Sequence, residues 1–252
     1  MNILILAAGR GTRLRELNKN KPKCLLEING ISLIERNLKV FLLKKLNPII
    51  ITGYQKEALN FLNITTVNNS EYFSTNMLWS LYKAIEYMNN DFLVCYSDIL
   101  VNPLQVDELI QFKSGIGLLI DKDWLQYWKL RFKNPLDDSE SLEVNKLGLI
   151  TSIGKKVKHI NEIKGQYTGF FKVAGSSRIT FKNSIIDYCE NKSTTSFARK
   201  AYLTDFLQYL INQDIHVKEI PTYGGWVEID SPEDIIAAKK SGRLKFLDEN
   251  IK

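Results

Sequence analysis

The chain opens with Ile3-Leu4-Ile5-Leu6-Ala7-Ala8-Gly9-Arg10-Gly11-Thr12-Arg13-Leu14, and Lys21-Pro22-Lys23 follows soon after. The apolar run predicts a buried strand, and the glycines after it predict a tight turn. Because glycine has no Cβ, phosphate oxygens can approach the backbone N–H groups of such a turn. Arginine and lysine nearby add positive charge. The stretch therefore predicts a phosphate-binding loop at the end of the first strand of an α/β fold.

The spacing of the glycines does not fit the two commonest phosphate-binding loops. Gly9 and Gly11 would begin a G-x-G-x-x-G run, but Leu14 stands where the third glycine belongs. A Walker loop needs glycine-lysine-serine or -threonine after four free positions, and the sequence contains none. On glycine spacing alone, a generic tight turn remains the alternative.

The segment Leu6 to Leu14, followed by Lys21-Pro22-Lys23, closely resembles the signature of the nucleotidyltransferases that activate sugar phosphates and small phospho-alcohols. The resemblance reappears at intervals as far as Asp230. It implies that the glycine loop wraps a nucleoside triphosphate and that Arg13 and Lys23 are catalytic residues that hold phosphates. The nucleotide-binding residues that it implies are Leu6, Ala7, Ala8, Gly9, Gly11, Thr12, Asn76, Ser80 and Ser97.

Length and composition predict one large domain. The 252 residues, 44% of them apolar, can bury a full core, and no linker or internal repeat interrupts them. We expect a single nucleotidyltransferase domain over 1–252. Within it, residues 1–100 would form the nucleotide-binding half, residues 101–230 the acceptor-binding half and residues 231–247 a C-terminal helix.

Composition also limits the location and the partners. No apolar run reaches the length of a membrane span and no signal-peptide pattern is present, so we expect a cytoplasmic protein without membrane insertion. The odd number of cysteines, 3, fits a reducing compartment. The net charge of +6 suits an anionic ligand, but no basic tract with interleaved aromatics indicates a nucleic-acid partner. A homo-oligomer is compatible with the sequence.

Strand and helix patterns alternate along the chain. We expect strands over 49–51, 92–96, 116–120, 147–153, 167–173, 215–220 and 225–229, and helices over 31–46, 75–87, 104–112, 178–190, 201–213 and from Ser231. Residues 121–141 show no steady period. The alternation predicts a doubly wound, mainly parallel, Rossmann-like sheet with helices on both faces and a smaller β-rich acceptor-binding part. Ligands of such sheets bind beyond the carboxyl ends of the strands, so the loops after Leu6, Ile51 and Tyr96 should converge.

Two aspartates are candidate metal ligands. Asp98 follows the strand Phe92–Tyr96, and Asp230 ends the segment Gly224-Gly225-Trp226-Val227-Glu228-Ile229-Asp230. Carboxylate oxygens at strand ends are suited to Mg²⁺ beside phosphates. An aspartate in a turn or at a helix N-cap is the alternative for each. The resemblance implies Mg²⁺ bound by Asp98 and Asp230, because the family carries metal-binding aspartates at these places.

The sequence also restricts the mechanism. Neither His159 nor His216 has a serine, cysteine or carboxylate arrangement around it. An anionic phosphate or phosphonate oxygen needs no general base to attack the α-phosphorus of a nucleotide. We therefore expect in-line displacement of pyrophosphate, with Arg13 and Lys23 stabilising the charge.

Later segments bear on the two substrates. Residues 74–81 and 165–172, and the run from Ala201 to Leu207, resemble the cytidylyltransferases for phosphocholine and 2-aminoethylphosphonate. They imply CTP as donor and a small phosphate- or phosphonate-bearing acceptor. A Gly154 where sugar enzymes carry glutamate argues against a hexose. We expect Lys155, Trp226 and Glu228 to bind the acceptor, Trp226 as an aromatic face for a cation. The alternatives are a sugar-1-phosphate nucleotidyltransferase and a non-catalytic nucleotide-binding protein.

Overall fold

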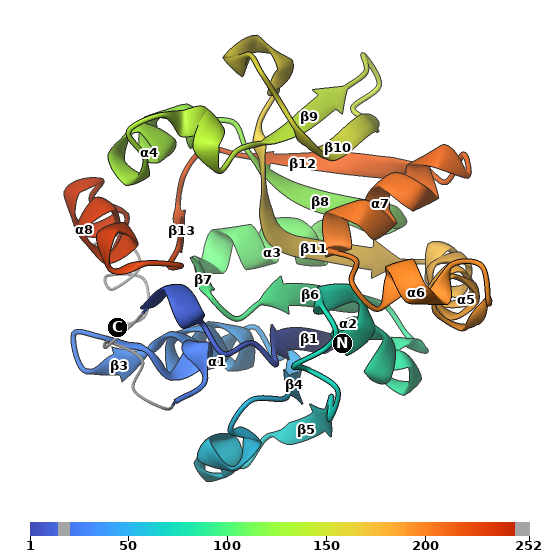
Figure 1. Ribbon diagram of the computed structural model, residues 1–252, viewed down its shortest axis with the longest axis horizontal. Coiled ribbons are helices and arrows are strands. Elements are labelled where there is room, and N and C mark those ends of the chain that lie inside the picture. The colour runs from blue at the N-terminus through green and yellow to red at the C-terminus, as the bar shows by residue number, and fades with distance from the viewer. Residues whose placement is uncertain (15–20, 245–252) are drawn as a thin grey trace.

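The computed structural model describes residues 1–14 and 21–244 (Figure 1). At its centre is a seven-stranded sheet with the order β12-β8-β11-β6-β1-β4-β5. The strands are β1 Asn2–Ala7, β4 Asn47–Thr52, β5 Thr65–Asn68, β6 Phe92–Tyr96, β8 Gly115–Asp121, β11 Gln166–Ala174 and β12 Val217–Thr222. In this sheet β11 runs antiparallel to both of its neighbours, and the other pairs are parallel. The doubly wound, mainly parallel α/β fold is confirmed.

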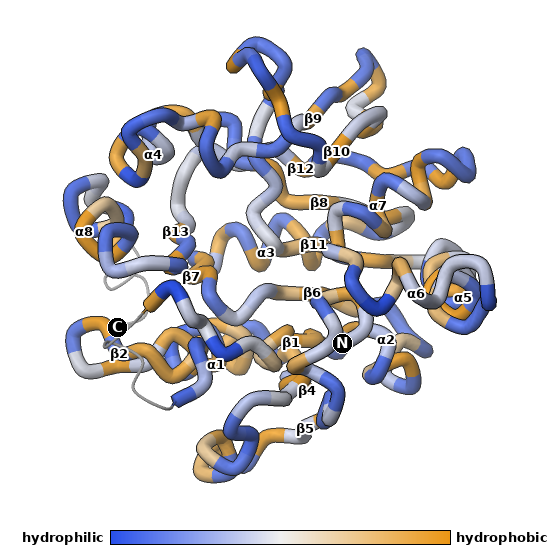
Figure 2. The backbone as a smooth tube through the Cα atoms, in the orientation of Figure 1, coloured by the Kyte–Doolittle hydropathy of each residue, from blue (hydrophilic) through white to orange (hydrophobic). Residues whose placement is uncertain are grey.

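Helices cover both faces of the sheet because β1 is apolar on both sides. Ile3 and Ile5 belong to one hydrophobic core, and Leu4 and Leu6 belong to the other. The first core is covered by α1 Leu33–Leu43, α3 Pro103–Gln111, α4 Trp124–Arg131 and α8 Pro232–Lys240. The second is covered by α2 Met77–Lys83, α5 Ser177–Glu190 and α7 Leu203–Asn212, and α6 Thr195–Ala198 lies beside α5. Figure 2 shows the hydrophobic segments concentrated in the central strands.

Small sheets and 3₁₀ turns complete the architecture. The two-stranded sheets are β7 Ile99–Val101 with β13 Trp226–Glu228, β9 Glu140–Val144 with β10 Ile150–Lys156, and β2 Glu27–Ile28 with β3 Ile31–Ser32. The 3₁₀ turns are η2 Lys23–Leu25, η3 Lys56–Leu62, η4 Ile85–Met88, η5 Pro135–Asp137 and η6 Ile160–Glu162. Among the helices of the described residues, none has both the length and the apolar character needed to cross a bilayer.

The loops at the carboxyl ends of β1, β4 and β6 converge, as the strand order predicts. The backbone N–H of Tyr54, after β4, donates to the carbonyl of Ala8, after β1, at 3.1 Å. Lys23 reaches Asp98, after β6, at 2.6 Å between Nζ and Oδ2. From β1 the chain continues to β4 and β5 on one side and then crosses to β6 on the other, so this edge is the topological switch point where ligands bind in such folds.

Several expected elements differ from the structure. Residues 121–141 contain α4, whose buried positions Trp124, Tyr127, Trp128 and Arg131 follow helical spacing. The last of these positions is occupied by the charged Arg131, so the apolar pattern of the sequence does not show the helical period. The helix expected over 31–46 begins only at Leu33, because Ser32 caps it. The helix expected over 75–87 ends at Lys83 and gives way to η4.

The remaining differences concern strands and the C-terminal helix. β5 and β9 lie where no strand is expected, and β10 begins at Ile150 because Asn145 closes a turn through the backbone N–H groups of Leu147 and Leu149. The helix expected over 231–247 ends at Lys240, and Gly242 follows with a φ of 74°. Residues 245–247 of that expectation lie outside the described residues.

Gly53 is required by the close approach of two loops. A Cβ at Gly53 would lie 2.6 Å from the Cβ of Tyr72 and 2.9 Å from the Cβ of Ala8. We expect Gly53→Ala to lower the free energy of unfolding by about 1–3 kcal/mol, because the loop after β1 must shift. A Cβ at Gly9 meets nothing within 4 Å, so Gly9→Ala should stay within about 0.5 kcal/mol of the wild type. Urea denaturation measures both values. Equal stability of the two variants would contradict this account of Gly53.

Candidate active site

The glycine loop lies open at the end of β1. Its turn is closed by a hydrogen bond from the backbone N–H of Leu14 to the carbonyl of Gly11 at 3.1 Å, and Gly11 has a φ of 70°. Gly9 is exposed and a Cβ there would touch nothing, so the outer side of the loop is free for a ligand. Leu6, Ala7 and Ala8 are buried under this loop, while Thr12 is exposed.

Four charged side chains from distant parts of the chain meet beside the loop. The ammonium group of Lys23 donates to Oδ2 of Asp98 at 2.6 Å and also to Oδ1 of Asp230. Nη2 of Arg13 lies 2.9 Å from Oδ2 of Asp230. The structure thus brings together all four residues that the sequence singles out for phosphate and metal binding.

The antiparallel pair of β7 and β13 accounts for the meeting of the two aspartates. Glu228 pairs with Ile99, and the backbone N–H of Ile229 donates to the carbonyl of Asp98 at 2.9 Å. This register places Asp230 next to Asp98, although one follows β6 and the other precedes α8. The 3₁₀ turn η2, which begins directly after Pro22, then presents Lys23 to both carboxylates.

Electrostatics favour the charged forms of this cluster. Burial disfavours the ammonium ion of Lys23, but the charges of Asp98 and Asp230 outweigh it and raise the pKa of Lys23. Burial likewise disfavours the carboxylate of Asp230, but Lys23 and Arg13 outweigh it and lower the pKa of Asp230. Lys23 and Asp230 are therefore both ionised at neutral pH.

The aspartates fit a divalent cation. Oδ1 of Asp98 is buried and has no hydrogen-bond partner among the described residues, so it is free to accept a further positive charge. The described residues contain no group of three or more histidine, cysteine, aspartate or glutamate side chains arranged to hold a metal. Mg²⁺ commonly takes only one or two protein carboxylates and completes its shell with phosphates and water. Asp98 and Asp230 match that pattern.

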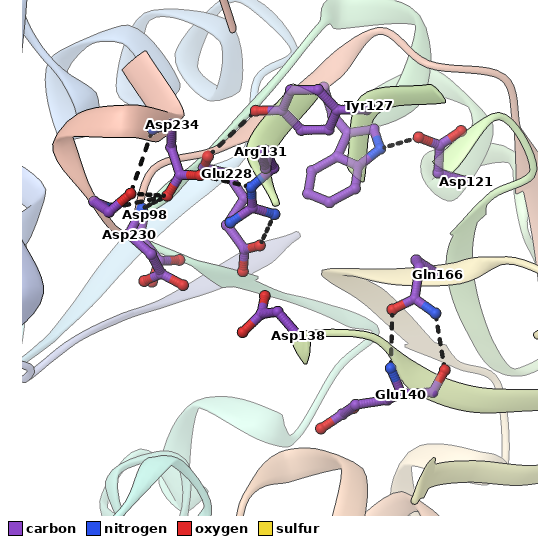
Figure 3. A network of polar contacts seen from close by, with 12 residues as sticks. Asp98, Asp121, Tyr127, Arg131, Asp138, Glu140, Gln166, Glu228, Asp230 and Asp234 are labelled. Carbon is purple, nitrogen blue, oxygen red and sulfur yellow. Dashed lines mark hydrogen bonds and ion pairs between the residues drawn. The ribbon is translucent and has the colours of Figure 1, made fainter. Parts of the chain in front are cut away.

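Further carboxylates surround the cluster (Figure 3). Asp138 lies 4.0 Å from Arg13, and in the view of Figure 3 it stands between Glu228 and Glu140. Oε2 of Glu228 accepts from Nη1 of Arg131 at 2.6 Å. Burial raises the pKa of Glu228 to about 7, Arg131 opposes the shift, and the charge of Asp230 adds to it. The site is therefore a fixed set of acidic and basic groups at the mouth of the glycine loop.

Comparison with known proteins supplies the family. Residues 3–116 match the model of the MobA-like NTP transferase domain. The CTP:phosphoglutamine cytidylyltransferase of Campylobacter jejuni is 33% identical over 256 residues, which span 93% of this chain and 98% of that protein. The chain belongs to the nucleotidyltransferase family. It is a nucleotidyltransferase.

Other relatives and solved structures agree. The choline-phosphate cytidylyltransferase of Streptococcus pneumoniae is 31% identical over 157 residues, or 60% of this chain and 68% of that protein. The structure of the CTP:phosphocholine cytidylyltransferase from Streptococcus pneumoniae has a TM-score of 0.73 at 22% identity, covering 95% of this chain and 98% of that one. The inositol-1-phosphate CTP transferase from T. maritima has a TM-score of 0.77 at 21% identity, covering 100% and 97%. These two structures show the shared fold.

The nucleotidyltransferase uses Asn76, Ser80 and Ser97 within its own architecture. Oδ1 of Asn76 accepts from the N–H of Met77 at 2.9 Å and begins α2. Oγ of Ser80 accepts from Nδ2 of Asn69 at 2.9 Å, and Ser97 is buried between β6 and Asp98. Contacts of these three residues with a nucleotide stay a prediction.

The three residues expected to bind the acceptor differ in their exposure to solvent. Trp226 is only 1% exposed, and its indole Nε1 donates to Oδ2 of the buried Asp121 at 2.8 Å. Its ring therefore has no face open to an acceptor, and the expectation of a cation-binding face is corrected: Trp226 fills the core against Tyr127 and Trp128. Glu228 is half-buried at the site, and Lys155 is exposed on β10.

Sequence reasoning missed four charged residues that the structure places near the site: Arg131, Asp138, Glu140 and Asp234. Asp234 had a signal, since Ser231-Pro232-Glu233-Asp234 is a capping box with aspartate in its third position. Arg131 had none, because its charge hides the helical period of α4. Asp138 and Glu140 also lie in the stretch 121–141, which shows no steady period, and had none.

The raised pKa of Glu228 predicts a pH-dependent effect on stability. Because its pKa of about 7 in the folded protein exceeds the ordinary 4.5, its contribution is full below about pH 4.5 and is lost as the pH rises to about 7. Glu228→Gln removes this loss and keeps an oxygen for Arg131. The free energy of unfolding of the variant minus that of the wild type should therefore increase between pH 5 and 8, by up to about 3 kcal/mol. Urea denaturation across this range measures the difference. A constant or decreasing difference would refute the shift.

Proposed function

We propose that the protein is a Mg²⁺-dependent cytidylyltransferase that transfers CMP from CTP to a small phosphate- or phosphonate-bearing acceptor and releases pyrophosphate. The observation that carries the proposal is the junction of Lys23 with Asp98 and Asp230, beside Arg13, at the mouth of the glycine loop. The named relatives that use CTP support the choice of nucleotide.

Different residues bind the phosphates, stabilise the developing charge and hold the metal. The backbone N–H groups from Gly9 to Thr12 bind phosphate oxygens of CTP, and Arg13 and Lys23 stabilise the negative charge that develops on the α-phosphate and the departing pyrophosphate. Asp98 and Asp230 hold Mg²⁺, which supplies a further positive charge beside the triphosphate when bound. Binding both substrates in line supplies most of the remaining rate enhancement.

Bonds and charges balance without a general base. An anionic oxygen of the acceptor forms a bond to the α-phosphorus of CTP, and the bond from that phosphorus to the oxygen bridging to the β-phosphate breaks. The electron pair of the broken bond leaves with pyrophosphate. No proton has to be removed from the nucleophile, which agrees with a site built from Lys23, Arg13 and carboxylates.

The acidic surroundings favour an acceptor that carries a protonated amine or a quaternary ammonium group as well as its phosphate. Asp138, Glu140 and Glu228 follow one another around the site in Figure 3. The backbone of Glu140 is held by the amide side chain of Gln166, through hydrogen bonds of 3.3 Å and 2.8 Å. Carboxylates in a fixed position attract an ammonium group. Phosphocholine, 2-aminoethylphosphonate and phosphoglutamine, named for the relatives, are therefore the acceptors to test first.

The central test is pyrophosphate release with each of the four nucleoside triphosphates and a panel of acceptors that includes sugar 1-phosphates. We expect turnover with CTP and an amine-bearing acceptor. Lys23→Ala should lower kcat by roughly 10²–10⁴-fold, because it removes a cation from the transition state. Lys21→Ala is the matched control, since Lys21 is 58% exposed and lies 3.8 Å from Glu27, away from the site. Turnover only with sugar 1-phosphates, or a near-normal rate for Lys23→Ala, would overturn the proposal.

The carboxylates of Asp138 and Glu140, here called the acidic rim, give a separate prediction. The double variant Asp138→Asn, Glu140→Gln should raise the KM of an amine-bearing acceptor about tenfold and change the KM of CTP by less than about twofold, because two charges near the acceptor are lost. Asp137→Asn is the control, since Asp137 is exposed and bonded to Asn134 at 3.2 Å. Steady-state kinetics with each substrate varied measure the effect. An unchanged acceptor KM would remove the rim from acceptor recognition.

A further inference from the structure

Arg131 is a buried cation in α4 that the reaction scheme above does not use. Its side chain is 0% exposed, and its guanidinium group lies 5.6, 4.8 and 5.0 Å from the ring centres of Tyr127, Trp128 and Phe132. Burying an arginine among aromatic rings is costly unless its charge is paired. The two carboxylates that pair with Arg131 therefore stabilise its buried charge.

The partners of Arg131 lie on either side of Asp230 in the sequence. Nη1 donates to Oε2 of Glu228 at 2.6 Å, and Nε donates to Oδ1 of Asp234 at 2.7 Å. Glu228 ends β13 and Asp234 lies in the first turn of α8. One planar guanidinium group thus joins the two ends of the turn that displays Asp230 (Figure 3).

Asp234 continues the connection to the backbone of Asp230. Its other oxygen, Oδ2, accepts from the backbone N–H of Asp230 at 2.9 Å and from that of Ser231 at 2.8 Å. Asp234 is only 2% exposed, so these bonds are shielded from water. A continuous series of hydrogen bonds therefore runs from Arg131 through Asp234 to the residue that meets Lys23.

A capping box alone does not require this arrangement. Helix α1 begins with the same type of box, in which Oε2 of Glu35 accepts from the N–H of Ser32 at 3.1 Å, and Glu35 is exposed. At α8 the capping carboxylate is instead buried against a buried arginine. The additional connection is what fixes the direction of the turn relative to α4.

We propose that Arg131 and Asp234 are positioning residues that hold the carboxylate of Asp230 where it meets Lys23 and Asp98 around the divalent cation. The proposal rests on the proposed function, because it assigns Asp230 a metal to bind. Outer groups that orient a metal ligand typically change metal affinity or activity by about 10–100-fold when they are replaced.

Asp234→Asn separates positioning from helix capping. The amide oxygen of asparagine can still accept from the N–H groups of Asp230 and Ser231, but its NH₂ group then faces Nε of Arg131, donor against donor. The opposite orientation would place the NH₂ group against two backbone N–H groups. Arg131→Lys keeps the charge but cannot donate to both carboxylates with a planar group, so it should be intermediate between the wild type and Arg131→Met.

The measurement is the affinity of the non-hydrolysable analogue α,β-methylene-CTP with and without Mn²⁺, by isothermal titration calorimetry. The Kd without Mn²⁺ divided by the Kd with Mn²⁺ isolates the contribution of the metal. We expect Asp234→Asn to reduce this ratio about tenfold or more and to lower kcat by a similar factor, with the KM of the acceptor little changed. Glu35→Gln, which alters the matching box of α1, should leave the ratio unchanged. If Arg131→Met does not fold, Asp234→Asn and Arg131→Lys decide the question.

Asp230→Asn distinguishes a failure of this inference from a failure of the proposed function. If Asp230→Asn loses the Mn²⁺ contribution while Asp234→Asn keeps that of the wild type, the positioning role is wrong and the metal site stands. If Asp230→Asn also keeps it, Asp230 binds no metal, and both the inference and the metal assignment fall. A loss in both variants, with Glu35→Gln unaffected, supports the positioning role.

Discussion

The ion pairs of one half-buried lysine, Lys23, determine how three distant segments are arranged. Lys23 can be ionised at its half-buried position only because Asp98 and Asp230 both lie against its ammonium group. Removing one partner of a buried ion pair commonly costs about 3–5 kcal/mol, since the other charge is left uncompensated. The loop after β1, the tip of β6 and the turn between β13 and α8 must therefore be in place together. The site and the fold are stabilised by the same contacts.

The balance of charge supports the divalent cation proposed for this site. The carboxylates around it are those of Asp98, Asp138, Glu228, Asp230 and Asp234, and the cations are Lys23, Arg13 and Arg131. A triphosphate that enters beside this excess of carboxylates is repelled by them. Oδ1 of Asp98 is buried without a hydrogen-bond partner among the described residues, so a positive charge added there would pair this oxygen and offset the repulsion of the triphosphate.

The aromatic residues have a structural task that their sequence pattern does not reveal. Trp124, Tyr127, Trp128 and Trp226 are all buried, and the last three pack against one another. Tyr127 and Trp128, together with Phe132, place their rings against the guanidinium group of Arg131 and keep water from its ion pairs, which strengthens those pairs. Trp226, whose ring the sequence suggests as a face for a cationic ligand, instead packs in the core against Tyr127 and Trp128.

The sequence by itself determined the elements with strong local signals. Apolar runs fixed β1, β4 and β6, the Ser-Pro-Glu-Asp box fixed the start of α8, and the glycine loop with Lys21-Pro22-Lys23 identified the family. Only the tertiary structure decided α4, the burial of Trp226 and the pairing of Arg131 with Asp234. Their stability comes from contacts between residues far apart in the chain, such as the bond from Arg131 to Asp234, and local patterns carry no information about such partners.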